Sequence, residues 1–99
     1  MKIEKQLNGT ELDVKISGEL NSATASELEA VIKNDLNGVK SLIIDCQELD
    51  YMSSAGLRVL LVAQKIMIKQ GSMVLKHINE TVKEIFDITG FINILTIED

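Results

Sequence analysis

Short stretches that suit strands alternate with longer stretches that suit helices along most of this chain. Residues 11–17 alternate apolar with polar side chains, which is the period of a half-buried strand. Residues 21–37 then carry leucine and isoleucine side chains four positions apart, which is the spacing of an apolar helix stripe. A chain in which the two periods alternate in this way folds into layers of helices on a sheet.

The N-terminal end predicts a β-hairpin. Asn8-Gly9 is a strong short signal for a tight turn between two strands. A two-residue turn at these positions would pair Ile3 with Val14. Residues opposite each other share a face of the sheet, so this pairing lines up the apolar side chains.

Further patterns complete the order of elements. The continuous apolar run at 41–45 predicts a central strand covered on both faces. The later elements are a helix at 57–68, a strand at 73–75, a helix at 79–89 and a strand at 94–97. The order is therefore β-β-α-β-α-β-α-β. We expect one α/β domain over residues 1–99, with a mixed β-sheet, an N-terminal β-hairpin and alternating helices.

Two details of the helices matter for function. Thr24 and Glu27 match a capping box at the start of the first helix, and Asn21 or Ser22 are alternative caps. Glycine rather than proline ends the helices, because the chain contains no proline.

Charge and composition exclude several classes of protein. The net charge of −5 argues against a nucleic-acid binder, which needs clustered basic residues. No stretch has the 18 to 20 apolar residues of a membrane span, and the N-terminus lacks the pattern of a signal peptide. Cys46 is the only cysteine, so no internal disulfide forms, and we expect a half-buried side chain. Together these features favour a cytoplasmic protein that contacts neither membrane nor nucleic acid.

The residues for catalysis or cofactor binding are also missing. One histidine and one cysteine do not make a zinc site, and no phosphate-binding or dinucleotide-binding glycine motif is present. A hydrolase elbow would need glycine at the place of Met52. His77 lies between a strand and a helix and is expected to pack against a loop or lie on the surface. We predict no enzyme activity, no metal and no cofactor.

The segment DYMSSAGLRVLL at 50–61 carries the strongest functional signal. Ser53 and Ser54 stand where a helix begins, and serine is a favoured N-cap. A helix has one N-cap position, so capping explains the presence of one serine but does not explain two. Ligand sites in α/β folds lie beyond the carboxyl ends of strands, and a phosphate there would meet the free amides of the helix. The position therefore suits a phosphorylated hydroxyl.

Three segments resemble the STAS domain of the bacterial anti-sigma factor antagonist family. The first, ISGELNSATASELE, is similar to the second strand, loop and first helix of that family. The second, SLIIDCQELDYMSSAGLRVLL, is similar to its signature, in which an apolar strand ends in Asp and leads to an (Asp or Ser)-Ser-(Ser, Thr or Ala)-Gly-Leu turn. The third, IFDITGFINILTIED, resembles its C-terminal segment, so the resemblance runs nearly end to end.

The resemblance implies partner switching. In that family the unphosphorylated antagonist binds an anti-sigma factor with serine kinase activity and so releases a sigma factor. The kinase then phosphorylates a serine at the helix start, and a PP2C-type phosphatase restores it. Alignment on Gly56 and Leu57 assigns the phosphorylated position to Ser54 rather than Ser53. Ser53 stands where the family often has Asp, as does Asn21.

The expected partner surface surrounds this serine. It consists of Asn21, Ser22, Ala23, Met52, Ser53, Ser54, Gly56, Leu57 and Arg58. We expect Met52 and Leu57 to supply exposed apolar contacts, and Arg58 to face either an acidic partner or solvent. We expect the free protein to be a monomer.

Two other functions fit the same residues. One is a STAS scaffold subunit of a transporter or lipid-trafficking complex that is never phosphorylated, although such relatives often lack the acceptor serine. The other is a nucleotide or small-molecule binder, which the absence of a glycine-rich loop disfavours.

Overall fold

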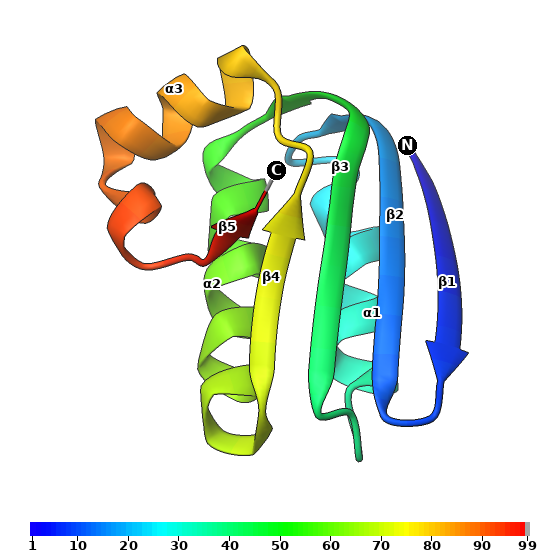
Figure 1. Ribbon diagram of the computed structural model, residues 1–99. Coiled ribbons are helices and arrows are strands. Elements are labelled where there is room, and N and C mark those ends of the chain that lie inside the picture. The colour runs from blue at the N-terminus through cyan, green and yellow to red at the C-terminus, as the bar shows by residue number, and fades with distance from the viewer. Residues whose placement is uncertain (99) are drawn as a thin grey trace.

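Five strands form one sheet in the order β1-β2-β3-β4-β5 (Figure 1). This computed structural model describes residues 1–98 of the chain. Its elements are β1 (Lys2–Asn8), β2 (Glu11–Leu20), α1 (Ala25–Asp35), β3 (Ser41–Met52), α2 (Ser54–Gln70), β4 (Ser72–Lys76), α3 (Glu80–Thr89), the short 3₁₀ helix η1 (Phe91–Asn93) and β5 (Ile97–Glu98). β1 runs antiparallel to β2, and every other neighbouring pair is parallel. The predicted mixed sheet and order of elements are confirmed.

Helices α1 and α2 cover the same face of the sheet, and α3 lies near the carboxyl ends of β3 and β4 (Figure 1). The opposite face carries no helix in residues 1–98. The prediction that β3 is covered on both faces is therefore wrong: Leu42 and Ile44 are buried, whereas Ile43 is partly exposed. The physical reason is that β2, β3 and β4 follow one another in sheet order. The connections through α1 and α2 join neighbouring parallel strands and run in the same direction across the sheet. Because such crossovers are right-handed, both helices lie on the same face.

The N-terminal hairpin is present, but its register differs from the prediction. Ile3 pairs with Ile16, and Asn8 pairs with Glu11, so the turn consists of Gly9 and Thr10. Gly9 has φ +63°, and no non-glycine residue of the hairpin has a positive φ. That is the pattern of a turn with glycine at its first central position, rather than of an Asn-Gly turn. The shift is two residues, so each side chain keeps its predicted face.

β3 is much longer than the predicted strand at 41–45. Its buried residues Cys46, Leu49 and Met52 are three positions apart, so the second half of the strand lacks a period of two. The pairing between β2 and β3 contains two register shifts in this region, which let the strand continue without strict alternation. This extension brings the chain to the start of α2.

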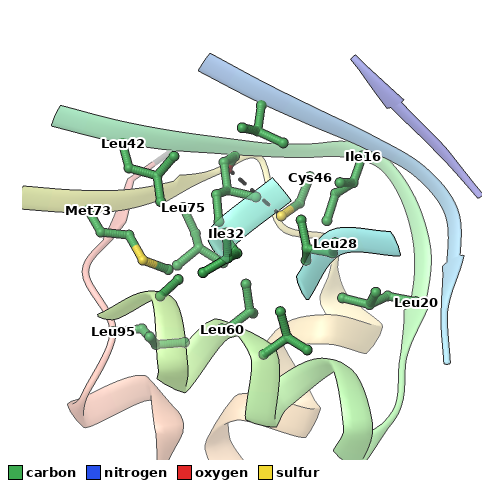
Figure 2. Close-up of a cluster of buried hydrophobic side chains, with 14 of the residues drawn as sticks. Ile16, Leu20, Leu28, Ile32, Leu42, Cys46, Leu60, Met73, Leu75 and Leu95 are labelled. Carbon is green, nitrogen blue, oxygen red and sulfur yellow. Dashed lines mark hydrogen bonds between the residues drawn. The ribbon is translucent and has the colours of Figure 1, made fainter. Parts of the chain in front are cut away.

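The core lies between the sheet and the helices and is almost entirely aliphatic (Figure 2). Cys46 is completely buried within this core, so the prediction of a half-buried side chain was wrong. Burial raises the pKa of this thiol to about 12, which keeps it protonated at neutral pH.

The elements end where local backbone geometry requires. A methyl group on Gly71 would lie 1.8 Å from the Lys40 carbonyl oxygen, so only glycine fits after α2. Gly90 ends α3 in the left-handed conformation, with φ 81°. The predicted last strand at 94–97 was wrong in extent, because η1 occupies residues 91–93 and β5 begins at Ile97.

Candidate functional site

The candidate site lies at the carboxyl ends of β2 and β3, where two loops meet. Leu20 and Met52 are paired as the last residues of these strands. The Ser53 amide donates to the Leu20 carbonyl oxygen at 2.8 Å, which ties the start of α2 to the loop after β2. The tertiary structure thus brings the predicted loop residues Asn21, Ser22 and Ala23 beside the two serines.

The two serines occupy different environments. Ser53 is the N-cap of α2 in extended conformation, and its side chain makes no capping hydrogen bond. Its hydroxyl oxygen is buried and has no hydrogen-bond partner in residues 1–98. Ser54 is the first residue of α2 and is exposed. Neither hydroxyl caps the helix, so the capping explanation of this pair was wrong.

The start of α2 presents donors toward Ser54. The first intrahelical bond runs from the Leu57 amide to the Ser53 carbonyl oxygen at 3.0 Å. The amides of Ser54, Ala55 and Gly56 therefore have no partner within the helix. The first turn of α2 contains no acidic residue, and the helix dipole adds partial positive charge. A dianionic group on Ser54 would meet favourable charge here.

Asn21 organises the neighbouring loop. Its side-chain oxygen accepts from the amides of Ala23 at 3.0 Å and Thr24 at 3.1 Å. The Thr24 hydroxyl accepts from the Asn21 amide at 2.9 Å and donates to the Glu19 carbonyl oxygen at 2.8 Å. Thr24 is the N-cap of α1 by position but makes no side-chain cap, so the predicted capping box was wrong. The loop is held by its own side chains, and Ser22 and Ala23 remain exposed on it.

Three predicted surface residues are buried instead. Met52 is 1 % and Leu57 is 5 % exposed, so the expectation that they supply exposed contacts was wrong. Met52 points into the core as the last inward residue of β3, and Leu57 lies on the core side of α2. Gly56 is buried under Leu20, whose Cγ would lie 2.7 Å from a methyl group at this position. The absence of a side chain at Gly56 lets the start of α2 pack closely against Leu20 and Met52 in the core.

Two exposed side chains flank the serines. Arg58 is exposed, as expected, and forms no ion pair within the described residues. Tyr51 is 43 % exposed, and sequence reasoning missed it. Its position next to inward-facing Met52 on a strand would have indicated an outward aromatic side chain, had the full length of β3 been recognised.

His77 takes part in a separate pair at the end of β4. Its Nδ1 lies 3.0 Å from Asp45 Oδ1, and its backbone has φ 60°. Burial opposes ionisation of Asp45, but hydrogen bonds from the Gln47 amide and His77 outweigh it and hold the pKa of that carboxyl below its usual value. His77 is exposed in the segment between β4 and α3, which confirms its predicted surface or loop position.

The described residues contain no group of three His, Cys, Asp or Glu side chains that could hold a metal ion. No helix within residues 1–98 is long and apolar enough to cross a membrane.

Comparison with known proteins gives consistent results. A model of the STAS domain family matches residues 2–99. The chain is 42 % identical over 84 residues to BtrV of Bordetella bronchiseptica, which is provisionally described as an anti-sigma factor antagonist; the match covers 83 % of this chain and 72 % of BtrV. It is 30 % identical over 98 residues to the anti-sigma-B factor antagonist of Bacillus subtilis, covering 98 % and 90 % of the two chains.

The fold also matches solved structures of the anti-sigma factor antagonist SpoIIAA of Bacillus. The unphosphorylated form aligns with a TM-score of 0.78 at 17 % identity, covering 99 % of this chain and 88 % of that one. The phosphorylated form aligns with a TM-score of 0.76 at 17 % identity, covering 99 % and 92 %. The same backbone fold therefore accommodates both states of that protein.

Proposed function

The chain belongs to the STAS domain family and is an anti-sigma factor antagonist, and we propose that phosphate on Ser54 controls its binding to an anti-sigma factor. The unphosphorylated form would bind that factor and free a sigma factor. The anti-sigma factor would itself be the serine kinase, and a PP2C-type phosphatase would restore the hydroxyl. We place these reactions in the cytoplasm, with the free antagonist as a monomer.

The contrast between the two serines carries the choice of Ser54. A kinase must bring the hydroxyl oxygen into line with the terminal phosphate of ATP, which requires an accessible side chain. Ser54 is exposed, whereas the Ser53 hydroxyl is buried beneath the start of α2. Modification of Ser53 would require the first turn of the helix to open.

The surrounding surface supports a docking role for the same site. Ser22, Ala23 and Arg58 are exposed near Ser54, and Tyr51 adds an aromatic side chain of the kind that interfaces favour. The buried residues of the predicted set would not contact the partner directly but would fix the positions of the two loops: Met52, Gly56 and Leu57. The partner would then cover Ser54 and remove it from water.

Electrostatics then explains how one phosphate could end the interaction. Phosphorylation adds about −1.5 to −2 charges. Burying these charges at an interface without a matching cation costs several kcal/mol. A penalty of about 3 kcal/mol weakens binding roughly a hundredfold. The free domain would keep its fold, because the amides at the start of α2 can bind the phosphate.

Phosphate mapping tests the acceptor residue. The wild-type protein, Ser54→Ala and Ser53→Ala would each be incubated with the cognate anti-sigma kinase and ATP and analysed by mass spectrometry. We expect phosphate on the wild type and on Ser53→Ala, and none on Ser54→Ala. Phosphate retained by Ser54→Ala would refute the assignment.

Binding tests the switch itself. Ser54→Asp should bind the anti-sigma factor at least about tenfold more weakly than wild type. Its far-ultraviolet circular dichroism should stay native. Glu19→Asp, a change at an exposed residue of the same edge that preserves charge, is the matched control and should bind normally. Unchanged affinity of Ser54→Asp, with phosphorylated wild type also binding normally, would contradict the electrostatic block.

A further inference from the structure

A groove between α2 and the edge of β4 lies at the opposite end of α2 from Ser54. Its volume is about 210 Å³, and its walls include Gln64 and Ile68 from α2, residues 72–74 of β4, and Thr96. Residues 54 and 68 are separated by nearly four turns of helix, or roughly 21 Å along its axis. The groove is therefore a surface distinct from the phosphorylation site.

The sheet edge inside this groove is unpaired. β5 contributes only Ile97 and Glu98, which pair with Leu75 and Lys76 of β4. In the preceding segment, which includes η1, Thr96 is the residue whose backbone hydrogen-bonds to this edge. The first three residues of β4 thus have no strand beside them on this side within the described chain.

The direction of the hydrogen bonds identifies which groups face the open edge. The Leu75 amide donates to the Thr96 carbonyl oxygen at 2.9 Å, toward β5. The Ser72 amide donates to the Lys40 carbonyl oxygen at 2.9 Å, toward β3. Backbone groups of alternate residues in a strand point to the same side. Met73 therefore directs its N–H and C=O toward the groove.

A side-chain acceptor in the groove is also unpaired. Gln64 donates through Nε2 to the Ile94 carbonyl oxygen at 3.5 Å, which orients its amide. Its Oε1 atom is buried and has no hydrogen-bond partner in residues 1–98. A buried acceptor without a donor costs free energy, so a ligand that supplies an N–H group would be favoured here.

The wall of the groove on the helix side is apolar with basic neighbours. Ile68 is 72 % exposed, and Lys65 and Lys69 are exposed beside it, one turn of helix apart. α2 contains Arg58, Lys65 and Lys69 but no acidic residue, in a chain whose net charge is −5. The charge of this helix is thus opposite to that of the molecule and would attract an acidic ligand.

From these observations we infer that the groove binds an extended acidic peptide segment of a partner protein, which adds a strand to β4. The segment would exchange hydrogen bonds with the N–H and C=O of Met73 and donate an N–H group to Gln64 Oε1. Every second side chain of an added strand would face α2. Among these, the apolar ones would contact Ile68 and the carboxylates would reach toward Lys65 and Lys69. Strand addition beside a helix is a known mode of peptide recognition, in which the backbone supplies affinity and side chains supply specificity.

Two synthetic peptides provide the test. One is a blocked peptide with the repeat Val-Thr-Glu-Thr, in which valine and glutamate take turns on one face of the strand, and the other has lysine in place of every glutamate. Each would be titrated into the isotopically labelled full chain at low salt and followed by amide resonances. We expect the glutamate peptide to shift the Met73 and Val74 amides and to slow hydrogen exchange at Met73. The lysine peptide should bind at least about tenfold more weakly.

Charge and apolar variants with matched controls complete the test. Lys65→Glu with Lys69→Glu should weaken the glutamate peptide by about tenfold or more, whereas Lys33→Glu with Lys83→Glu, an equal charge change at exposed sites elsewhere, should change its affinity less than about twofold. Ile68→Ser should weaken binding, and Ile88→Ser, at a residue 85 % exposed on α3, should not.

Three results would overturn the inference. The first is a set of shifted amides that excludes Met73, and the second is equal binding of the two peptides. The third is a self-association of the free chain that Ile68→Ser abolishes, because a second copy would then occupy the edge. Phosphorylation of Ser54 should leave peptide binding intact, so failure here is distinguishable from failure of the proposed switch.

Discussion

Replacing Gly56 with alanine is the sharpest test of how the site is built. A methyl group on Gly56 would lie 2.7 Å from Leu20 Cγ, 2.8 Å from Leu20 Cδ2 and 3.0 Å from Met52 Cγ. Both neighbours are almost completely buried, and Leu20 would clash at its branch point. Simple rotation of a flexible chain end therefore cannot relieve the contact.

Two effects of opposite sign compete in this variant. Alanine is favoured over glycine in a helix interior by about 1 kcal/mol, and by less in the first turn. Overpacking a filled core costs about 1 to 3 kcal/mol. We expect the clash to prevail and the free energy of unfolding to fall by about 1 kcal/mol, which lowers the Tm of a domain this size by about 4 to 8 °C.

Urea denaturation followed by circular dichroism measures this change, since the chain has no tryptophan to report by fluorescence. A double-mutant cycle identifies the cause. Leu20→Ala alone should destabilise by about 2 to 5 kcal/mol. In that background Gly56→Ala should become neutral or stabilising, a coupling of about 1 to 3 kcal/mol. An unchanged or raised stability of the single Gly56→Ala variant would refute the packing argument.

Three further predictions concern single groups. Ser53→Ala should leave the free energy of unfolding unchanged or raise it by up to about 1 kcal/mol, because the buried hydroxyl has no partner. Loss of a true cap would instead lower it by about 1 kcal/mol, and urea titration distinguishes the two results. The depressed pKa of Asp45 contributes stability that is present above its ordinary value of 3.8 and is lost as pH falls through the lower folded pKa, so Asp45→Asn should flatten the acid limb of a stability–pH curve; an unchanged limb would exclude this role. Cys46 should react with a thiol reagent at pH 8 only after urea unfolds the chain, and rapid labelling of the native protein would contradict its burial.

The fold was predictable where one period persisted over several residues. Strand β2 and the apolar stripe of α1 kept their periods, and glycine marked the ends of α2 and α3. Prediction failed where the period broke. The second half of β3 pairs with β2 through shifts in register, and no local pattern encodes such a shift because the partner strand is distant in the chain.

The site was predictable as a set of residues but not as a surface. The sequence pattern indicated two serines at a helix start, and the family resemblance added the loop of Asn21 to the predicted site. Neither of these showed that Ser54 is exposed while the Ser53 hydroxyl, Met52 and Leu57 are buried, because that follows from tertiary packing. Burial depends on which side of a helix or strand meets the rest of the core, and that is set by packing between elements far apart in the chain.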